Sequence, residues 1–157
     1  MWAPWRNEYV TGGAKSAGCV LCEAYALRNE EKSLVVHAGT SVFAVMNLYP
    51  YNAGHVMVSP VRHIGRLGDA TAEELSGIMD LARRLEGIFA EAYHPDGINV
   101  GMNLGKSAGA GIPDHIHLHV VPRWNGDTNF MTTLADTRVI SEDPYKARDT
   151  LRGFFRR

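Results

Sequence analysis

The 157-residue sequence lacks any apolar run close to the roughly 20 residues that a helix needs to cross a bilayer. Residues 1–6 also lack the apolar core of a secretory signal peptide. The net charge of −1 leaves no basic excess of the kind that proteins coating nucleic acid carry. We therefore expect a cytoplasmic protein that binds neither membranes nor nucleic acid.

Cysteine is also scarce, since the sequence contains two, Cys19 and Cys22. Two thiols cannot form the framework of a disulfide-rich secreted domain, and their close spacing is typical of a metal site or a redox pair. A redox pair of this kind usually precedes a helix in a thioredoxin-like strand–helix–strand unit, which the sequence does not show. A tetrahedral zinc ion would need two further ligands from elsewhere in the chain. A pair of thiols that binds nothing is the remaining alternative.

The composition excludes a disordered chain, because 45% of the residues are hydrophobic and 21% are charged. A chain of this length is typical of one domain with a core of ordinary size. No internal repeat or low-complexity segment divides it. We therefore expect a single domain over residues 1–157, with the cysteine segment near its N-terminus and a helical tail at its C-terminus.

The pattern of apolar residues predicts an antiparallel sheet and one long helix. Thr71 and Glu74 form a capping box for a helix over residues 71–92, which carries an apolar stripe. The stripe comprises Leu75, Ile78, Met79, Ala82, Leu85 and Phe89. Further expected elements are helices at 20–30 and 143–155 and strands at 33–37, 41–47, 55–60, 98–104 and 115–121. Because strands outnumber helices and hairpin-length connections join them, we expect an α+β fold.

Three histidines, His115, His117 and His119, alternate with apolar residues in the last expected strand. Alternate residues of a strand share a face and lie about 6.6 Å apart, at a rise of about 3.3 Å per residue. Imidazoles on one face have two chemical uses: they can bind a metal ion, or one can act as a nucleophile while its neighbours assist. A nucleophilic imidazole must be neutral, with a hydrogen bond fixing its second nitrogen. The central position of His117 favours it as the nucleophile.

Residues 101–107 nearly spell a P-loop, Gly-x₄-Gly-Lys-[Ser/Thr], but they have one residue too few between the glycines. A P-loop also opens a long helix, which the following glycines and Pro113 would break here. We reject that interpretation. The stretch is instead a candidate anion cradle, because glycines allow backbone N–H groups to converge on phosphate oxygens. A plain loop that connects two strands is the alternative.

Two stretches together resemble the signatures of the histidine-triad (HIT) superfamily of nucleotide hydrolases and transferases. Residues 115–121 match its motif His-φ-His-φ-His-φ-φ, where φ is apolar, and residues 54–60, followed by His63, are similar to its second signature. The resemblance covers roughly residues 19–124. It implies a HIT-like α+β fold, a homodimer whose two sheets join into one, and a covalent nucleotidyl intermediate on the middle histidine.

Carried over residue by residue, the resemblance assigns roles within the site. It makes His117 the nucleophile and His55 the histidine that supports it, while His119 and the loop N–H groups stabilise the phosphoryl oxygens. Asn47 corresponds to a residue that contacts ribose, and Asn103 to a residue on the phosphate side.

One position departs from the family pattern. The family commonly has a polar side chain three or four residues before the first motif histidine, where this sequence has Gly111 or Ile112. We therefore expect Lys106 or Ser107 of the same loop to supply the phosphate contact. Trp124 is expected either to stack on adenine or to pack at a dimer interface.

Some bacterial HIT proteins and the related galactose-1-phosphate uridylyltransferases complete a two-cysteine metal site with two histidines. By position these are His63 and His115 in this sequence. The resemblance therefore implies a closed structural zinc site made of Cys19, Cys22, His63 and His115, which would orient His115 beside the nucleophile. It implies no organic cofactor.

Within the superfamily, residues 47–52, 101–105 and 119–124 look most like the diadenosine-tetraphosphate phosphorylase branch, and so do Asn129 and Phe130. This likeness implies attack on the α-phosphate of an adenine mono- or dinucleotide and transfer of the adenylyl group to inorganic phosphate or water. Three alternatives stay open. They are an adenosine phosphoramidate hydrolase of the same family, a metal-dependent phosphohydrolase that uses the three motif histidines as ligands, and a nucleotide-sensing module without turnover.

Overall fold

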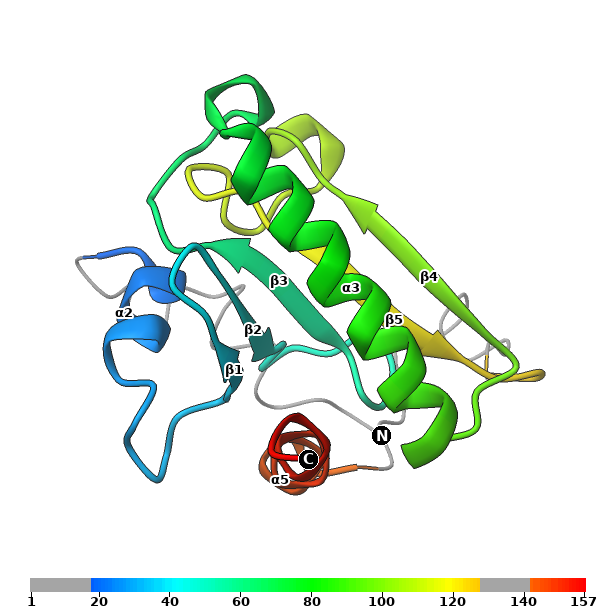
Figure 1. Cartoon of the computed structure of the whole chain (residues 1–157). Helices are drawn as coiled ribbons and strands as arrows, with labels where there is room; N and C mark the ends of the chain where they lie inside the picture. The colour runs from blue at the N-terminus through cyan, green and yellow to red at the C-terminus, as the bar shows by residue number, and fades with distance from the viewer. Residues whose placement is uncertain (1–17, 128–141) are drawn as a thin grey trace.

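The computed structural model describes residues 18–127 and 142–157, which form a five-stranded antiparallel sheet flanked by helices (Figure 1). The strands lie in the order β1-β2-β3-β5-β4. The predicted α+β class is therefore confirmed. Asn129 and Phe130, which were part of the family resemblance, lie outside the described residues. The elements are α2 (Val20–Ala26), β1 (Val35–Ala38), β2 (Val42–Met46), β3 (Val56–Pro60), α3 (Ala72–Ala92), β4 (Gly97–Met102), β5 (Leu118–Arg123) and α5 (Pro144–Phe155), with 3₁₀ turns at Leu67–Asp69 and Lys106–Ala108.

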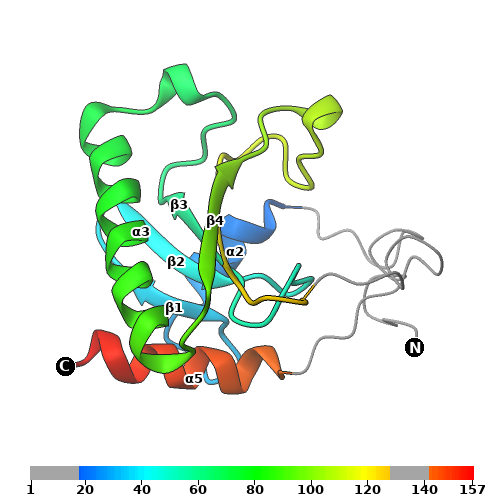
Figure 2. The ribbon, with the colours of Figure 1, turned by 90° about the vertical axis from the view of Figure 1, so that its right-hand side faces the viewer.

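Helices cover both faces of the sheet, and strand β2 shows how the sequence provides for this. Every residue of β2 is buried. Val42, Ala44 and Met46 pack in the cluster that includes α3 and α5, whereas Phe43 and Val45 pack with Leu21 of α2 on the other face. Successive side chains of a strand point to opposite faces, so an all-apolar strand requires cover on both. Figure 2 shows α3 and α2 on these opposite sides.

Helix α3 begins at the predicted capping box, in which Thr71 and Glu74 satisfy each other's backbone N–H groups. The predicted apolar stripe is partly wrong. Met79 is 58% exposed and Leu75 is 36% exposed, whereas Leu81, which was not included, is 4% exposed. A helix turns about 100° per residue, so the face centred on Ile78, Leu81 and Leu85 turns position 79 toward solvent.

The predicted strand over residues 115–121 begins too early, because β5 starts at Leu118. Residues 115–117 are held by hydrogen bonds other than those between paired strands. Ile116 donates its N–H to the carbonyl of Ile64 at 2.8 Å, and its own carbonyl accepts from Ser59 Oγ at 2.9 Å. These bonds place His115 and His117 in the approach to β5, where Ile116 still faces the core at 3% exposure.

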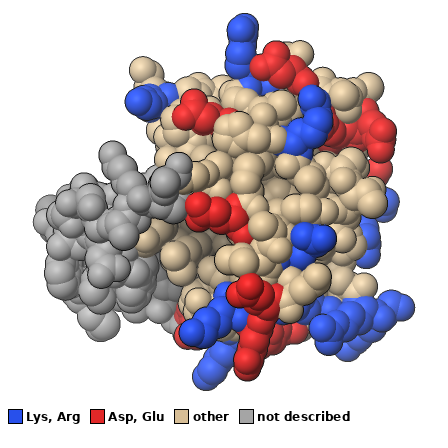
Figure 3. Space-filling model, turned by 90° about the vertical axis from the view of Figure 1, so that its left-hand side faces the viewer, with Lys and Arg blue, Asp and Glu red and all other residues tan. Residues whose placement is uncertain are grey.

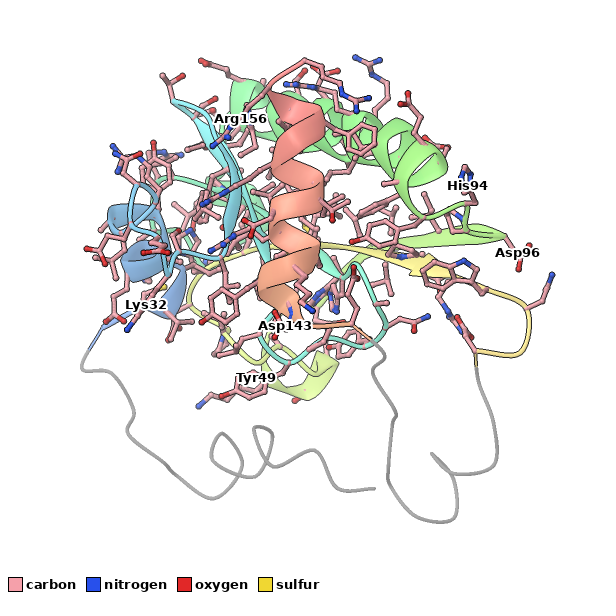
Figure 4. The ribbon with its side chains drawn as sticks, turned by 90° about the horizontal axis from the view of Figure 1, so that it is seen from below. Lys32, Tyr49, His94, Asp96, Asp143 and Arg156 are labelled. Atoms are coloured by element: carbon pink, nitrogen blue, oxygen red, sulfur yellow. The ribbon has the colours of Figure 1, made fainter. Side chains whose placement is uncertain are left out.

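Helix α5 confirms the predicted helical tail and covers one edge of the sheet. Asp143 caps it by accepting from the backbone N–H groups of Tyr145 and Lys146. Figure 4 shows the helix from below, running from Asp143 toward Arg156. Arg152 Nε donates to the carbonyl of Val35 in β1 at 2.7 Å. The outer strand β1 therefore packs against α5, and β4 forms the opposite edge of the sheet.

Charged side chains of both signs share the surface. On the face drawn in Figure 3, basic and acidic side chains are interspersed rather than gathered into one basic patch. In the two described ranges, every helix is too short or too polar to cross a membrane.

Candidate active site and metal centre

Three histidines that are distant in sequence meet where β3 and β5 lie side by side. His55 directly precedes β3, His117 directly precedes β5, and His119 lies in β5 opposite Met57. His55 Nε2 is 2.9 Å from His119 Nδ1, and the rings of His117 and His119 are 4.9 Å apart in an edge-on arrangement. His55 is completely buried and His117 is 4% exposed. The structure thus places His55 against His119 rather than against His117.

The hydrogen bonding of His117 defines which of its nitrogens carries the proton. Its Nδ1 lies 2.8 Å from the backbone carbonyl of His115. A carbonyl can only accept, so Nδ1 bears the hydrogen and Nε2 keeps a free lone pair. Burial lowers the pKa of His117, which keeps the ring neutral at pH 7. A buried, neutral imidazole with one unprotonated nitrogen meets the requirements of a nucleophile.

His55 and His119 form a hydrogen-bond relay with a defined direction. The backbone N–H of Tyr51 donates to His55 Nδ1 at 2.9 Å, so His55 carries its hydrogen on Nε2. That Nε2–H donates to His119 Nδ1 at 2.9 Å, which leaves the hydrogen of His119 on its own Nε2. Burial, with the neighbouring histidines, lowers the pKa of His55 to about 3 and that of His119 to about 4. His119 is therefore a neutral ring that offers one N–H donor.

Tyr51 lies in the site with a role that the sequence did not predict, since as an aromatic it was expected only to stack on adenine or pack at a dimer interface. Its ring lies over both members of the relay, with centroid distances of 4.6 Å to His55 and 5.4 Å to His119. Its backbone N–H contact with His55 involves no side chain, so no residue-type pattern could have predicted it. The position of Tyr51 inside the family-like stretch 47–52 was the available signal.

The predicted ribose contact, Asn47, lies at the start of the same loop and is half-buried. Its Oδ1 accepts the N–H of Tyr49 at 2.9 Å, and its Nδ2 is 3.4 Å from His55 Nδ1. Asn47 thus lies beside the histidine relay and shapes the loop that covers it. The half-buried Asn103 follows directly after β4.

The other predicted substrate residues lie in the connection between β4 and β5 or just beyond β5. Lys106 and Ser107 belong to an exposed 3₁₀ turn, and Gly111 is exposed. Gly105 and Gly109 flank this turn at φ of 85° and 88°, a left-handed region that favours glycine. Trp124 follows β5 and is half-buried. The structure leaves Lys106 and Ser107 accessible to an anion, and their contact with phosphate stays a prediction.

The four predicted metal ligands lie together. The ligand atoms of Cys19, Cys22, His63 and His115 are all within 4.8 Å of one another. Cys19 Sγ is 3.3 Å from His115 Nδ1, and Cys22 Sγ is 3.4 Å from His63 Nδ1. His115 Nε2 lies 2.9 Å from the carbonyl of Pro60 and must donate to it, so its Nδ1 lone pair points at the thiols. This donor set could hold a metal ion.

His115 joins the cluster of four candidate metal ligands through its side chain and contacts His117 through its backbone carbonyl. Among the described residues, this cluster is the one group with a metal-ligand arrangement, and His115 is the one triad member in it. The Nδ1 atoms of His117 and His119 are already bonded to a carbonyl and to His55. The geometry therefore disfavours the alternative in which all three motif histidines bind one ion.

Comparison with known proteins supports the motif-based interpretation. The HIT domain family model matches residues 28–126. The chain is 40% identical over 160 residues to the AP-4-A phosphorylase of Mycobacterium tuberculosis H37Rv, an alignment covering 97% of this chain and 80% of that protein. It is 38% identical over 81 residues to the bis(5'-adenosyl)-triphosphatase of Dictyostelium discoideum, which covers 52% of this chain and 54% of that protein.

A solved structure gives the same fold. A zinc-bound histidine triad family protein from Mycobacterium smegmatis superimposes with a TM-score of 0.72 at 29% sequence identity. The match covers 90% of this chain and 96% of that one.

Proposed function

This chain belongs to the HIT domain family, and from that premise we propose that it is a phosphorylase that transfers the adenylyl group of diadenosine tetraphosphate to inorganic phosphate. One observation carries the proposal: the His115 carbonyl holds the hydrogen of His117 on Nδ1 and leaves Nε2 free to attack. The M. tuberculosis relative named as AP-4-A phosphorylase supports the choice of substrate and acceptor.

In the first step, His117 Nε2 attacks the α-phosphorus of diadenosine tetraphosphate. A P–N bond forms, the bond from that phosphorus to the bridging oxygen breaks, and ATP leaves. The adenylyl-imidazolium keeps its Nδ1–H on the His115 carbonyl. In the second step, an oxygen of inorganic phosphate attacks the same phosphorus and the P–N bond breaks. The products are ADP and a neutral His117, and the phosphate proton is released to solvent.

His119 stabilises the negative charge that develops on the phosphoryl oxygens. The relay from Tyr51 through His55 leaves His119 as an Nε2–H donor, and its ring lies 4.9 Å from that of His117. A fixed donor stabilises the transition state without reorganising during the reaction. The backbone N–H groups of the glycine-rich loop, with Lys106 and Ser107, supply further donors in this proposal.

Different residues of the chain argue for and against inorganic phosphate as the acceptor of the adenylyl group. Gly111 or Ile112 stands where the family commonly has a polar side chain, so neither side chain there can hydrogen-bond an incoming phosphate. Lys106 and Ser107 are exposed in the same connection and can replace it. The remaining substrate contacts we propose are Asn47 to ribose, Asn103 to phosphate and Trp124 to adenine.

We further propose that the metal cluster holds a structural zinc ion. A tetrahedral zinc site needs sulfur and nitrogen ligands about 3.5 Å apart. The sulfur–nitrogen distances are 3.3 Å for Cys19–His115, 3.4 Å for Cys22–His63 and 3.6 Å for Cys22–His115, which fit. The zinc-bound M. smegmatis relative adds support. Bound zinc would tie α2 to His115 and so steady the carbonyl that orients His117.

The chain as a whole we propose to be one HIT domain that forms a homodimer through β4. Strand β4 is an outer strand, and Val100 at its centre is 51% exposed. Arg152 occupies a carbonyl of β1, the opposite outer strand. An exposed strand edge pairs readily with a second copy of itself. Light scattering should give twice the subunit mass of 17.3 kDa, and Val100→Lys should reduce it to the monomer value.

Product analysis tests the proposed reaction. Diadenosine tetraphosphate is incubated with the zinc-loaded protein at zero and at millimolar phosphate, and the nucleotides are separated by chromatography. We expect ADP and ATP in equal amounts when phosphate is present. AMP and ATP alone at every phosphate concentration would make the protein a hydrolase, as the name of the D. discoideum relative would favour. His117→Ala is the control and should form neither set of products.

A further inference from the structure

A largely buried carboxylate lies just beyond β5, outside the HIT signatures. The Asp127 side chain is 11% exposed. It accepts Arg123 Nε at 2.6 Å and Arg123 Nη2 at 2.7 Å, the backbone N–H of Trp124 at 3.1 Å, and Asn52 Nδ2 at 2.7 Å. Gly126, at φ of 80°, allows the turn that brings Asp127 back beside Trp124. Arg123 and Trp124, at the end of β5, thus hold the Asp127 carboxylate in place, and the carboxylate in turn accepts a hydrogen bond from Asn52.

Asn52, which donates to Asp127, belongs to the loop that covers the histidine relay. Its Nδ2 donates both to Asp127 and to the backbone carbonyl of Pro122 at 3.1 Å. Its own carbonyl accepts the N–H of His55 at 3.3 Å. Asn52 directly follows Tyr51, whose N–H donates to His55 Nδ1. The position of the Tyr51 N–H therefore depends on where Asp127 holds Asn52.

Two further contacts make this connection rigid. Gly54 approaches Pro122 so closely that an added Cβ would lie 3.2 Å from Pro122 Cγ. Arg123 also donates its Nη1 to Asn99 Oδ1 at 2.6 Å, so it joins the end of β5 to β4. The bidentate pair of Arg123 and Asp127 is the geometry in which a guanidinium and a carboxylate fix each other's orientation. The network thus spans both strands and the loop.

From these contacts we propose that Asp127, together with Arg123 and Asn52, is a positioning network that holds the Tyr51 loop in place and so fixes the tautomers of His55 and His119. Without it, the Tyr51 N–H no longer defines His55 Nδ1 as the acceptor. His55 can then carry its hydrogen on either nitrogen, and His119 loses its defined Nε2–H donor. The catalytic consequence rests on the proposed function, whereas the tautomer consequence does not.

Nitrogen NMR of the imidazoles tests the tautomer consequence in the zinc-loaded protein without nucleotide. Protonated and unprotonated ring nitrogens have well-separated chemical shifts, so the wild type should show His55 and His119 each as a single Nε2–H tautomer. In Asp127→Asn and Asn52→Ala, the two shifts of His55 should move toward each other. Asp149→Asn, which removes the 2.8 Å ion pair to Arg148 on α5, is the matched control and should leave them unchanged.

Kinetics with diadenosine tetraphosphate test the catalytic consequence. We expect both variants to lower kcat about tenfold or more with little change in KM, because His119 acts on charge that develops in the transition state. Unchanged imidazole shifts in folded variants would overturn the proposal, whatever the kinetics show. A wild type without turnover would instead refute the proposed function and leave the shifts to decide. Asn52→Ala keeps the Arg123–Asp127 pair intact, so it serves if Asp127→Asn does not fold.

Discussion

Acidification from pH 7 to pH 5 should destabilise this protein through His55, and His55→Gln should remove that part of the pH dependence. Burial, followed by the charges of His119 and His117, lowers the pKa of His55 from 6.5 to about 3 in the folded state. The folded protein therefore keeps His55 neutral at pH 5, whereas the unfolded chain takes up a proton below about pH 6.5. Since the unfolded state binds more protons, stability falls as the pH falls.

The magnitude at pH 5 depends mainly on the unfolded state, because the folded pKa lies well below that pH. The interval from pH 6.5 to pH 5 then corresponds to about 2 kcal/mol of lost stability from His55 alone. The loss continues with further acidification and ends near pH 3, where the folded protein also takes up the proton. A change of this size is a large share of the roughly 5–15 kcal/mol that stabilises a typical domain.

Urea unfolding at pH 7, 6 and 5 measures this effect. The free energy of unfolding of the wild type should fall by about 2 kcal/mol more than that of His55→Gln between pH 7 and pH 5. The other titrating groups, including the four candidate metal ligands, are present in both proteins, and those that His55 does not contact cancel in the difference. Parallel pH dependences would refute the inference that His55 is held neutral by burial.

Cys19→Ser should abolish stoichiometric zinc binding in elemental analysis and lower Tm, because a closed metal site contributes to folding; full zinc content at an unchanged Tm would contradict the proposed site. Gly54→Ala should lower the free energy of unfolding by about 1–2 kcal/mol, since φ is 71° and Pro122 Cγ would lie 3.2 Å from the new Cβ. Its control is Gly87→Ala in α3, where a Cβ meets no atom within 4 Å, and which should stabilise the protein. Finally, kcat/KM should be nearly the same at pH 6 and pH 8, because burial lowers the pKa of His117 and, with the charge of His117, lowers that of His119 to about 4; an ordinary histidine would be only roughly one-quarter neutral at pH 6, and a fall of that size would contradict the assigned environment.

The sequence allowed the architecture and the metal cluster to be predicted because these follow from residue types at fixed spacing. Every residue of β2 is apolar, which requires cover on both faces, and α2 and α3 provide it. The four candidate metal ligands are residue types that zinc prefers, and the structure brings their ligand atoms within 4.8 Å of one another. Thr71 and Glu74 form the predicted cap because their reciprocal bonds are local.

The parts that could not be predicted depend on backbone groups and long-range contacts. The carbonyl of Ile64 accepts the N–H of Ile116, and β5 begins only at Leu118. Every residue type has a backbone carbonyl, so the sequence could not indicate this bond. The same applies to the Tyr51 N–H, which orients His55. Asp127 acts on Asn52, a residue 75 positions away, and no local pattern relates the two.

The most direct test of nucleophilic catalysis is to trap the adenylyl group on the protein. Zinc-loaded enzyme is mixed with diadenosine tetraphosphate in the absence of phosphate, quenched within milliseconds at alkaline pH, and digested with trypsin. Cleavage after Lys106 and Arg123 places all three motif histidines in one peptide, residues 107–123. Fragmentation of that peptide should locate the adenylyl group on His117, and added phosphate should discharge it as ADP. Turnover without any adduct, or an adduct on His115 or His119, would contradict the mechanism.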